Sequence, residues 1–154
     1  MLQGIESDEK FQLVDLNALI ATLAEDFAEL GFPIELSGRA HAPLSVRAQG
    51  LRRTLVNLLQ NAKQHASHAS LGLEDTGTEV IFSLRDNGPG LPEEELERVF
   101  EPFYRVESSR NRETGGTGLG LSIARDIVQS HGGELTLTNG RSGGLEATLR
   151  LPRL

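Results

Sequence analysis

Apolar residues recur at the spacing of one helix face in three segments of the chain, which predicts three amphipathic helices. The first begins after Asp15, a suitable N-cap, and ends before Gly31, a suitable C′ residue. The second covers about 49–65. The third covers about 119–131 and ends at His131, where a cap and a positive charge are both favourable. The positions predicted to face the core are Leu19, Ile20, Leu23, Phe27 and Leu30; Leu51, Leu55, Leu58, Leu59 and Ala62; and Ile123, Ala124, Ile127 and Val128.

Shorter runs of alternating or β-branched residues predict strands between these helices and after the last one. Asp75-Thr76-Gly77 supplies turn residues for one hairpin, and the glycines of 140–144 supply them for a closing hairpin. The predicted strands lie near 11–16, 34–36, 44–46, 67–74, 78–85, 134–138 and 145–151, with Val80, Phe82 and Leu84 alternating toward the core. Pro92 and the glutamates after it predict a short helix that ends within 99–103.

Length and composition favour one globular domain. The 154 residues suffice for a real core, and the net charge of −7 disfavours a nucleic-acid partner. The chain has no cysteine, which excludes disulfides and thiolate metal sites. No apolar run reaches membrane-spanning length, and residues 1–10 are polar, which predicts a disordered leader or linker remnant before a domain at 11–154.

Two glycine-containing segments are candidates for ligand binding. Four glycines fall within 115–120, directly before the third helix. They suit a loop that brings phosphate to a helix N-terminus, and equally a flexible linker, but match neither the dinucleotide fingerprint nor the P-loop. Asp86 precedes Asn-Gly-Pro-Gly at a strand end. Its carboxylate could accept a hydrogen bond from the exocyclic amine of adenine, or could simply form an Asx turn.

The second helix carries a polar stripe of Asn57, Asn61 and His65, each four residues from the last. An amide oxygen such as that of Asn61 is a hard ligand suited to Mg²⁺, and Asn57 could contact phosphate, water or the metal. The alternative is an exposed helix face that carries two asparagines without a function.

Four motifs, taken together and in order, resemble the N box, first glycine box, F box and second glycine box of sensor histidine kinases. They are 57–62 (Asn-Leu-Leu-Gln-Asn-Ala), 86–90 (Asp-Asn-Gly-Pro-Gly), 100–105 (Phe-Glu-Pro-Phe-Tyr-Arg) and 116–121 (Gly-Thr-Gly-Leu-Gly-Leu). The resemblance is to the catalytic ATP-binding domain and covers the chain from about Phe11 to Leu151. It implies the Bergerat ATP-binding fold, an α+β two-layer sandwich. Such a fold has a mixed, mostly antiparallel sheet of about five strands with three main helices on one face.

The resemblance also implies roles for individual residues. Asp86 would hold the adenine amine, and Asn61 would coordinate Mg²⁺. The residues implied to bind ATP are Asn57, Asn61, Gln64, His65, Asp86, Gly88, Gly90, Leu91, Gly116, Thr117, Gly118, Leu119 and Gly120. Residues 104–115 would form the ATP lid, in which Arg105, Arg110 and Arg112 are candidate phosphate contacts, although none is a certain catalytic residue.

The sequence departs from the family pattern at two positions of the second helix. Many relatives carry Lys or Arg where this chain has Gln64, and the neighbouring Lys63 points about 100° away. A lid arginine would then supply the charge, or ATP would bind more weakly. His65 stands where relatives often have an aromatic residue against adenine, and it would add a titrating group there.

None of the four histidines has the sequence setting of a kinase phosphoacceptor. The chain therefore resembles half of an enzyme, which would present the γ-phosphoryl of MgATP to a histidine on a separate dimerisation domain, for relay to a response regulator. The resemblance implies a homodimeric parent, a monomeric isolated domain and a cytosolic location below an inner-membrane sensor. The alternatives are an ATPase of the same superfamily, an anti-sigma serine kinase and a degenerate partner-binding domain. In such ATPases a general-base glutamate occupies the place of Asn57.

Overall fold

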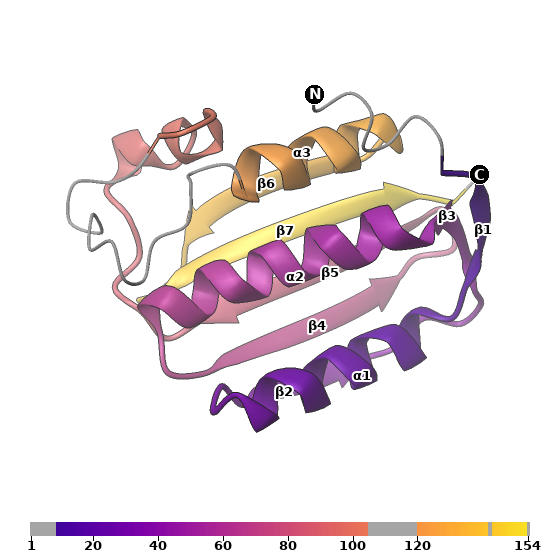
Figure 1. Ribbon diagram of the computed structural model, residues 1–154, viewed down its shortest axis with the longest axis horizontal. Helices are drawn as coiled ribbons and strands as arrows, with labels where there is room; N and C mark the ends of the chain where they lie inside the picture. Colours follow the sequence, from indigo (N-terminus) through magenta and orange to yellow (C-terminus); the bar gives the residue numbers. More distant parts are fainter. Residues whose placement is uncertain (1–8, 105–119, 142, 154) are drawn as a thin grey trace.

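The structure is a computed structural model that describes residues 9–104, 120–141 and 143–153. A five-stranded sheet forms one layer and helices form the other (Figure 1). The strand order is β2-β4-β5-β7-β6, in which only the β2–β4 pair is parallel. This confirms the predicted mixed, mostly antiparallel sheet. Its strands are β2 (Ile34–Gly38), β4 (Ala69–Asp75), β5 (Glu79–Asp86), β6 (Glu134–Asn139) and β7 (Leu145–Pro152).

Three helices, α1 (Leu16–Glu29), α2 (Ala48–His65) and α3 (Gly120–Ser130), lie along the same face of this sheet (Figure 1). Asp15 caps α1 by accepting from the Ala18 amide at 3.2 Å, and Gly31 follows its end with a φ of +86°. The predicted faces of α2 and α3 are buried.

Two expectations for α1 were wrong. Leu16 is the buried first residue of the helix rather than part of a strand, and Leu30 is 63% exposed because the helix ends before it.

A second, two-stranded sheet pairs β1 (Phe11–Val14) with β3 (Leu44–Arg47). The positions of both strands were predicted, but their pairing was not. Local alternation indicates that a segment is extended without saying which distant segment it meets. The pairing places the beginning of the described chain beside the start of α2.

The start of α2 is held by Glu9 rather than by its own N-cap. Arg47 makes no side-chain cap, and Glu9 instead accepts from the amides of Gln49 and Gly50 at 2.6 and 3.0 Å. The Arg47 Nε donates back to the Glu9 carbonyl at 3.0 Å. Glu9 is therefore anchored, unlike the frayed leader expected for residues 1–10, of which 1–8 lie outside the described residues.

His131 caps the end of α3 and ties it to β3. It is buried, its Nδ1 lies 2.8 Å from the Ile127 carbonyl, and its Nε2 accepts from the Arg47 amide at 3.0 Å. The expected capping role is therefore confirmed.

The short helix expected after Pro92 is instead two single turns of 3₁₀ helix, η2 (Glu93–Glu95) and η3 (Arg98–Phe100). The segment is anchored on α3 by Arg125, which makes two hydrogen bonds to Glu97 at 3.0 and 2.8 Å. The Arg125 guanidinium also lies 3.9 Å from the centroid of the Phe100 ring. Tertiary contacts of this kind override the helical tendency of a glutamate run.

An enclosed ion pair fastens Arg153 to the last residue of β4, Asp75. Arg153 donates to both oxygens of Asp75, whose side chain is only 2% exposed, and also to the carbonyls of Ala42 and Pro43. The Arg153 hydrogen bonds, with those from the His41 and Gly77 amides, hold the pKa of Asp75 far below its ordinary value.

This ion pair predicts an acid-sensitive contribution to stability. A depressed folded pKa stabilises the protein above the unfolded pKa of about 3.9, and the contribution is lost as the pH falls below that value. We expect Asp75→Asn to lower Tm by about 5 °C or more at pH 7, and this difference from wild type should shrink as the pH falls below about 3.9. Thermal unfolding across pH measures the difference. A difference that stays constant from pH 7 into the acid range would contradict the assignment, and the exposed Asp126→Asn is the matched control.

No helix in the described ranges is long and apolar enough to cross a membrane.

Candidate functional site

The predicted site residues that the structure describes gather at one end of the sheet. The C-terminal ends of α2 and β5 and the start of α3 all lie at this end (Figure 1). Two contacts join the three elements. The Asn57 amide donates to the Gly120 carbonyl at 3.1 Å, and a Cβ on Gly88 would lie 2.6 Å from the His65 carbonyl. Residues far apart in the sequence are thus brought to one place.

Asp86 is the last residue of β5 and shares the parity of Val80, Phe82 and Leu84, so its side chain belongs to the helix-covered face. One carboxylate oxygen, Oδ1, accepts from the amides of Gly88 and Leu145 at 2.9 and 3.1 Å. The hydrogen bond from the Gly88 amide forms an Asx turn, which is the alternative role that the sequence suggested for Asp86. The other oxygen makes no hydrogen bond within the described part of the chain. The turn fixes the carboxylate and leaves Oδ2 as a free acceptor.

The loop after Asp86 is shaped by close contacts within the chain. Gly90 has a φ of +77°, and a Cβ there would lie 2.6 Å from Asn139 Oδ1. Gly88 has equally little space beside His65. Part of the need for glycine in this loop therefore comes from packing against α2 and β6, in addition to any room needed for a ligand.

Asn139, at the end of β6, is a residue that sequence reasoning missed. Its carboxamide accepts from the Leu91 amide at 2.9 Å and donates to the Leu91 carbonyl at 2.7 Å. No motif includes it, since a single asparagine before a glycine turn is an ordinary turn signal. Its role is visible only in the fold, which brings Asn139 next to Leu91, 48 residues earlier in the chain.

The polar stripe of α2 contacts the start of α3 through Asn57. Asn57 and Asn61 are half-buried, whereas Gln64 and His65 are exposed. Asn57 is used partly by the protein itself, because its amide nitrogen holds the first residue of α3. Asn61 makes no hydrogen bond to the rest of the described chain, so its amide oxygen is available to a ligand.

Several predicted site residues fall outside the described residues. These are Arg105, Arg110 and Arg112 of the expected lid, and Gly116, Thr117, Gly118 and Leu119 of the second glycine box. Of that box, the structure describes Gly120 and Leu121, at the first turn of α3.

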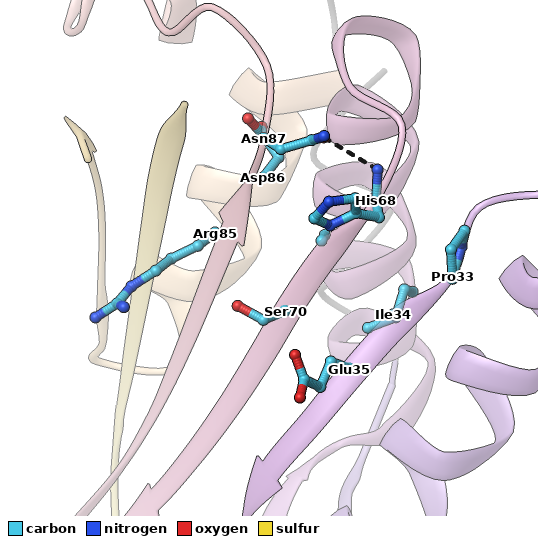
Figure 2. A pocket seen from close by; sticks show the side chains of 9 residues that line it. Pro33, Ile34, Glu35, His68, Ser70, Arg85, Asp86 and Asn87 are labelled. Atoms are coloured by element: carbon cyan, nitrogen blue, oxygen red, sulfur yellow. Dashed lines mark hydrogen bonds between the residues drawn. The ribbon is translucent and has the colours of Figure 1, made fainter. Parts of the chain in front are cut away.

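A cavity of about 400 Å³ borders Asp86 from a different direction (Figure 2). Its polar lining includes Glu35, Ser70 and Arg85, which occupy paired positions across β2, β4 and β5 on the face without helices. Asn87 closes the cavity at its end, where its Oδ1 accepts from the His68 amide at 3.1 Å and from the Ser67 amide at 2.9 Å. Asn87 therefore fixes the connection from α2 to β4. Asp86 also lines this cavity, but Glu35, Ser70 and Arg85 belong to the face of the sheet opposite α2.

The described residues fit an adenine nucleotide with a hard divalent cation. Asp86 offers a fixed free acceptor, and Asn61 offers an uncommitted amide oxygen on the neighbouring helix. Among the described residues no group of three or more His, Asp or Glu side chains could hold a metal ion. Mg²⁺ commonly uses one or two protein ligands together with water and phosphate oxygens, which is compatible with a single asparagine.

A mixed sheet with three helices on one face is the architecture of histidine kinase catalytic domains. The catalytic domain of the kinase ThkA has a TM-score of 0.76 at 28% identity, with 94% of this chain and 98% of that chain covered. ShkA, solved in complex with AMPPNP, has a TM-score of 0.82 at 26% identity over 99% of this chain and 33% of its own length.

The family is shown by the sequence as well. The model described as histidine kinase-, DNA gyrase B-, and HSP90-like ATPase matches residues 46–154, and the chain belongs to this family. The present chain is 45% identical to the sensor histidine kinase GtrS of Pseudomonas aeruginosa, and the match covers 95% of the present chain. The same match covers only 30% of the length of GtrS.

Proposed function

We propose that this chain binds MgATP and presents the γ-phosphoryl group to a histidine on a separate dimerisation and phosphoacceptor domain. The observation that carries the proposal is the arrangement of Asp86, whose Oδ1 is fixed by two backbone amides while Oδ2, on the helix-covered face, has no hydrogen-bond partner among the described residues. A fixed free acceptor suits the adenine amine and disfavours guanine, which presents a carbonyl oxygen at that position. The AMPPNP bound to the similar kinase ShkA supports the same ligand class.

In this proposal, Asn61 would hold Mg²⁺, and Gly88, Gly90 and Leu91 would border the base. Bound Mg²⁺ would neutralise charge on the phosphate oxygens during transfer. The start of α3, with Gly120, would receive the phosphates at a helix N-terminus. The acceptor imidazole nitrogen would form a bond to the γ-phosphorus while the bond to the bridging oxygen breaks, releasing ADP. The chain itself contributes orientation rather than a covalent step.

Asn57 favours the kinase over a hydrolase of the same superfamily. A hydrolase needs a general base to activate water, whereas Asn57 carries an amide whose nitrogen donates to the Gly120 carbonyl. The side chain therefore positions α3 and offers no carboxylate to water. An ATP-binding serine kinase or anti-sigma switch is another alternative, and the identity of the phosphoacceptor decides between it and the histidine kinase.

The biological setting is part of the proposal. The parent would be a homodimeric two-component sensor with this domain in the cytosol below an inner membrane, and the isolated domain would be monomeric. The phosphoryl group would pass on to a response-regulator aspartate. The naming of relatives such as GtrS as sensor histidine kinases supports this setting.

The proposal predicts that the isolated chain will not phosphorylate itself. Incubation with ATP labelled in the γ-phosphate should leave no acid-labile label on the chain. Adding the upstream region of the same parent protein should place acid-labile, base-stable label on that region. Acid-labile label on the chain alone, or acid-stable label on a serine of an added partner, would contradict the histidine kinase assignment.

A further inference from the structure

We infer that Asn139 is a positioning residue for the adenine pocket, acting through the backbone of Leu91. The inference deepens the proposed function and rests on it. Asn139 satisfies both backbone polar groups of Leu91, with the amide at 2.9 Å and the carbonyl at 2.7 Å. One side chain thus replaces the two hydrogen bonds that a neighbouring strand would supply.

Asn139 and its neighbour in the sheet, Leu145, both hold the loop that contains Asp86 and Leu91. Asn139 ends β6, and Leu145, its partner in register, begins β7 and donates its amide to Asp86 Oδ1. The turn between β6 and β7 therefore fixes the 86–91 loop at two points, the carboxylate at one end and Leu91 at the other. Gly90 lies between Asp86 and Leu91, and a Cβ at Gly90 would clash with the Asn139 side chain.

This double attachment sets where the free oxygen of Asp86 lies relative to the wall of the base pocket. Recognition of a base amine needs the acceptor held within a few tenths of an ångström of its position. Releasing Leu91 would leave Asp86 in its Asx turn while the opposite side of the pocket could move. Loss of Asn139 should therefore reduce discrimination between bases as well as affinity.

The chain offers a matched control in Asn17, which makes the same bidentate pairing far from the site. Its carboxamide accepts from the Ala40 amide and donates to the Ala40 carbonyl, both at 2.9 Å. Asn17→Ala removes the same kind of hydrogen-bond pair, in a more buried setting, on the α1 side of the fold. A purely structural effect should appear in both variants, whereas an effect on the pocket should appear only at Asn139.

The test is calorimetric titration of ATP and GTP with Mg²⁺ into wild type, Asn139→Ala, Asn139→Asp and Asn17→Ala, below the Tm of each. We expect Asn139→Ala to bind ATP about tenfold more weakly and to show a smaller ATP-over-GTP preference. The isosteric Asn139→Asp keeps the acceptor for Leu91 N–H and loses the donor, so it should show the same direction of change even if the alanine variant does not fold. Asn17→Ala should bind as wild type does.

Wild-type affinity and selectivity in both Asn139 variants would overturn the inference and leave the proposed function intact. Equal losses at Asn139 and Asn17 would also overturn it, because they would indicate general destabilisation. A wild-type chain that binds neither nucleotide would overturn the proposed function and the inference together.

Discussion

Replacing Asp86 with asparagine is expected to weaken ATP binding about 100-fold while the fold remains intact, because a charged hydrogen bond contributes about 1.5–3 kcal/mol. The substitution preserves an oxygen for the amides of Gly88 and Leu145, which now bond to Oδ1. It replaces the free Oδ2 with an NH₂ group, which would face the amine of adenine donor to donor. The variant should therefore lose recognition of the adenine amine and keep the Asx turn at residues 86–88.

Calorimetry with ATP and far-UV circular dichroism of the same sample separate these two effects. Asp126→Asn is the matched control, since it removes one negative charge from an exposed position of α3. An Asp86→Asn variant that folds normally and binds ATP as wild type does would remove Asp86 from the base site. The same variant with a melted fold would contradict the expectation that the asparagine oxygen keeps the turn.

Replacing Asn61 with alanine is expected to remove most of the gain in ATP affinity that Mg²⁺ provides. The side chain is half-buried, makes no hydrogen bond to the described chain, and lies one helical turn beyond Asn57, which holds α3. Its free amide oxygen suits a hard cation. We expect the affinity in Mg²⁺ to fall by about 10- to 100-fold, with little change in EDTA.

Titrations in Mg²⁺ and in EDTA give the coupling between metal and nucleotide for each variant. Gln60→Ala is the matched control because Gln60 is exposed on the same helix and precedes Asn61 directly. Equal Mg²⁺ dependence in Asn61→Ala and wild type would show that the metal is held elsewhere. A loss of affinity that is the same in EDTA would assign Asn61 to the nucleotide instead.

Periodicity located most elements because the core faces of α2, α3 and β5 carry one kind of residue at one spacing. The faces Leu51–Ala62, Ile123–Val128 and Val80–Leu84 each needed only local information. The β1–β3 pairing could not be predicted in this way. Extended segments such as 11–14 and 44–47 carry no local signal for a partner, and tertiary packing decided the pairing.

The same limit applied to the site. Asp86 and Asn61 stand in motifs of unusual composition, and the sequence therefore singled them out. Asn139 and Glu9 act through backbone groups of residues far away in the chain, at Leu91 and at the start of α2. The capping role of His131 was predicted from its helix terminus, whereas its contact with the Arg47 amide was not, because Arg47 belongs to another element.

Titration of ATP, ADP and GTP into the wild-type chain, with and without Mg²⁺, tests whether Asp86 and Asn61 form a site for MgATP. We expect ATP and ADP to bind with micromolar to millimolar affinity, Mg²⁺ to strengthen the binding of ATP, and GTP to bind at least about tenfold more weakly. Binding of none of these nucleotides, or of GTP as tightly as ATP, would contradict this expectation.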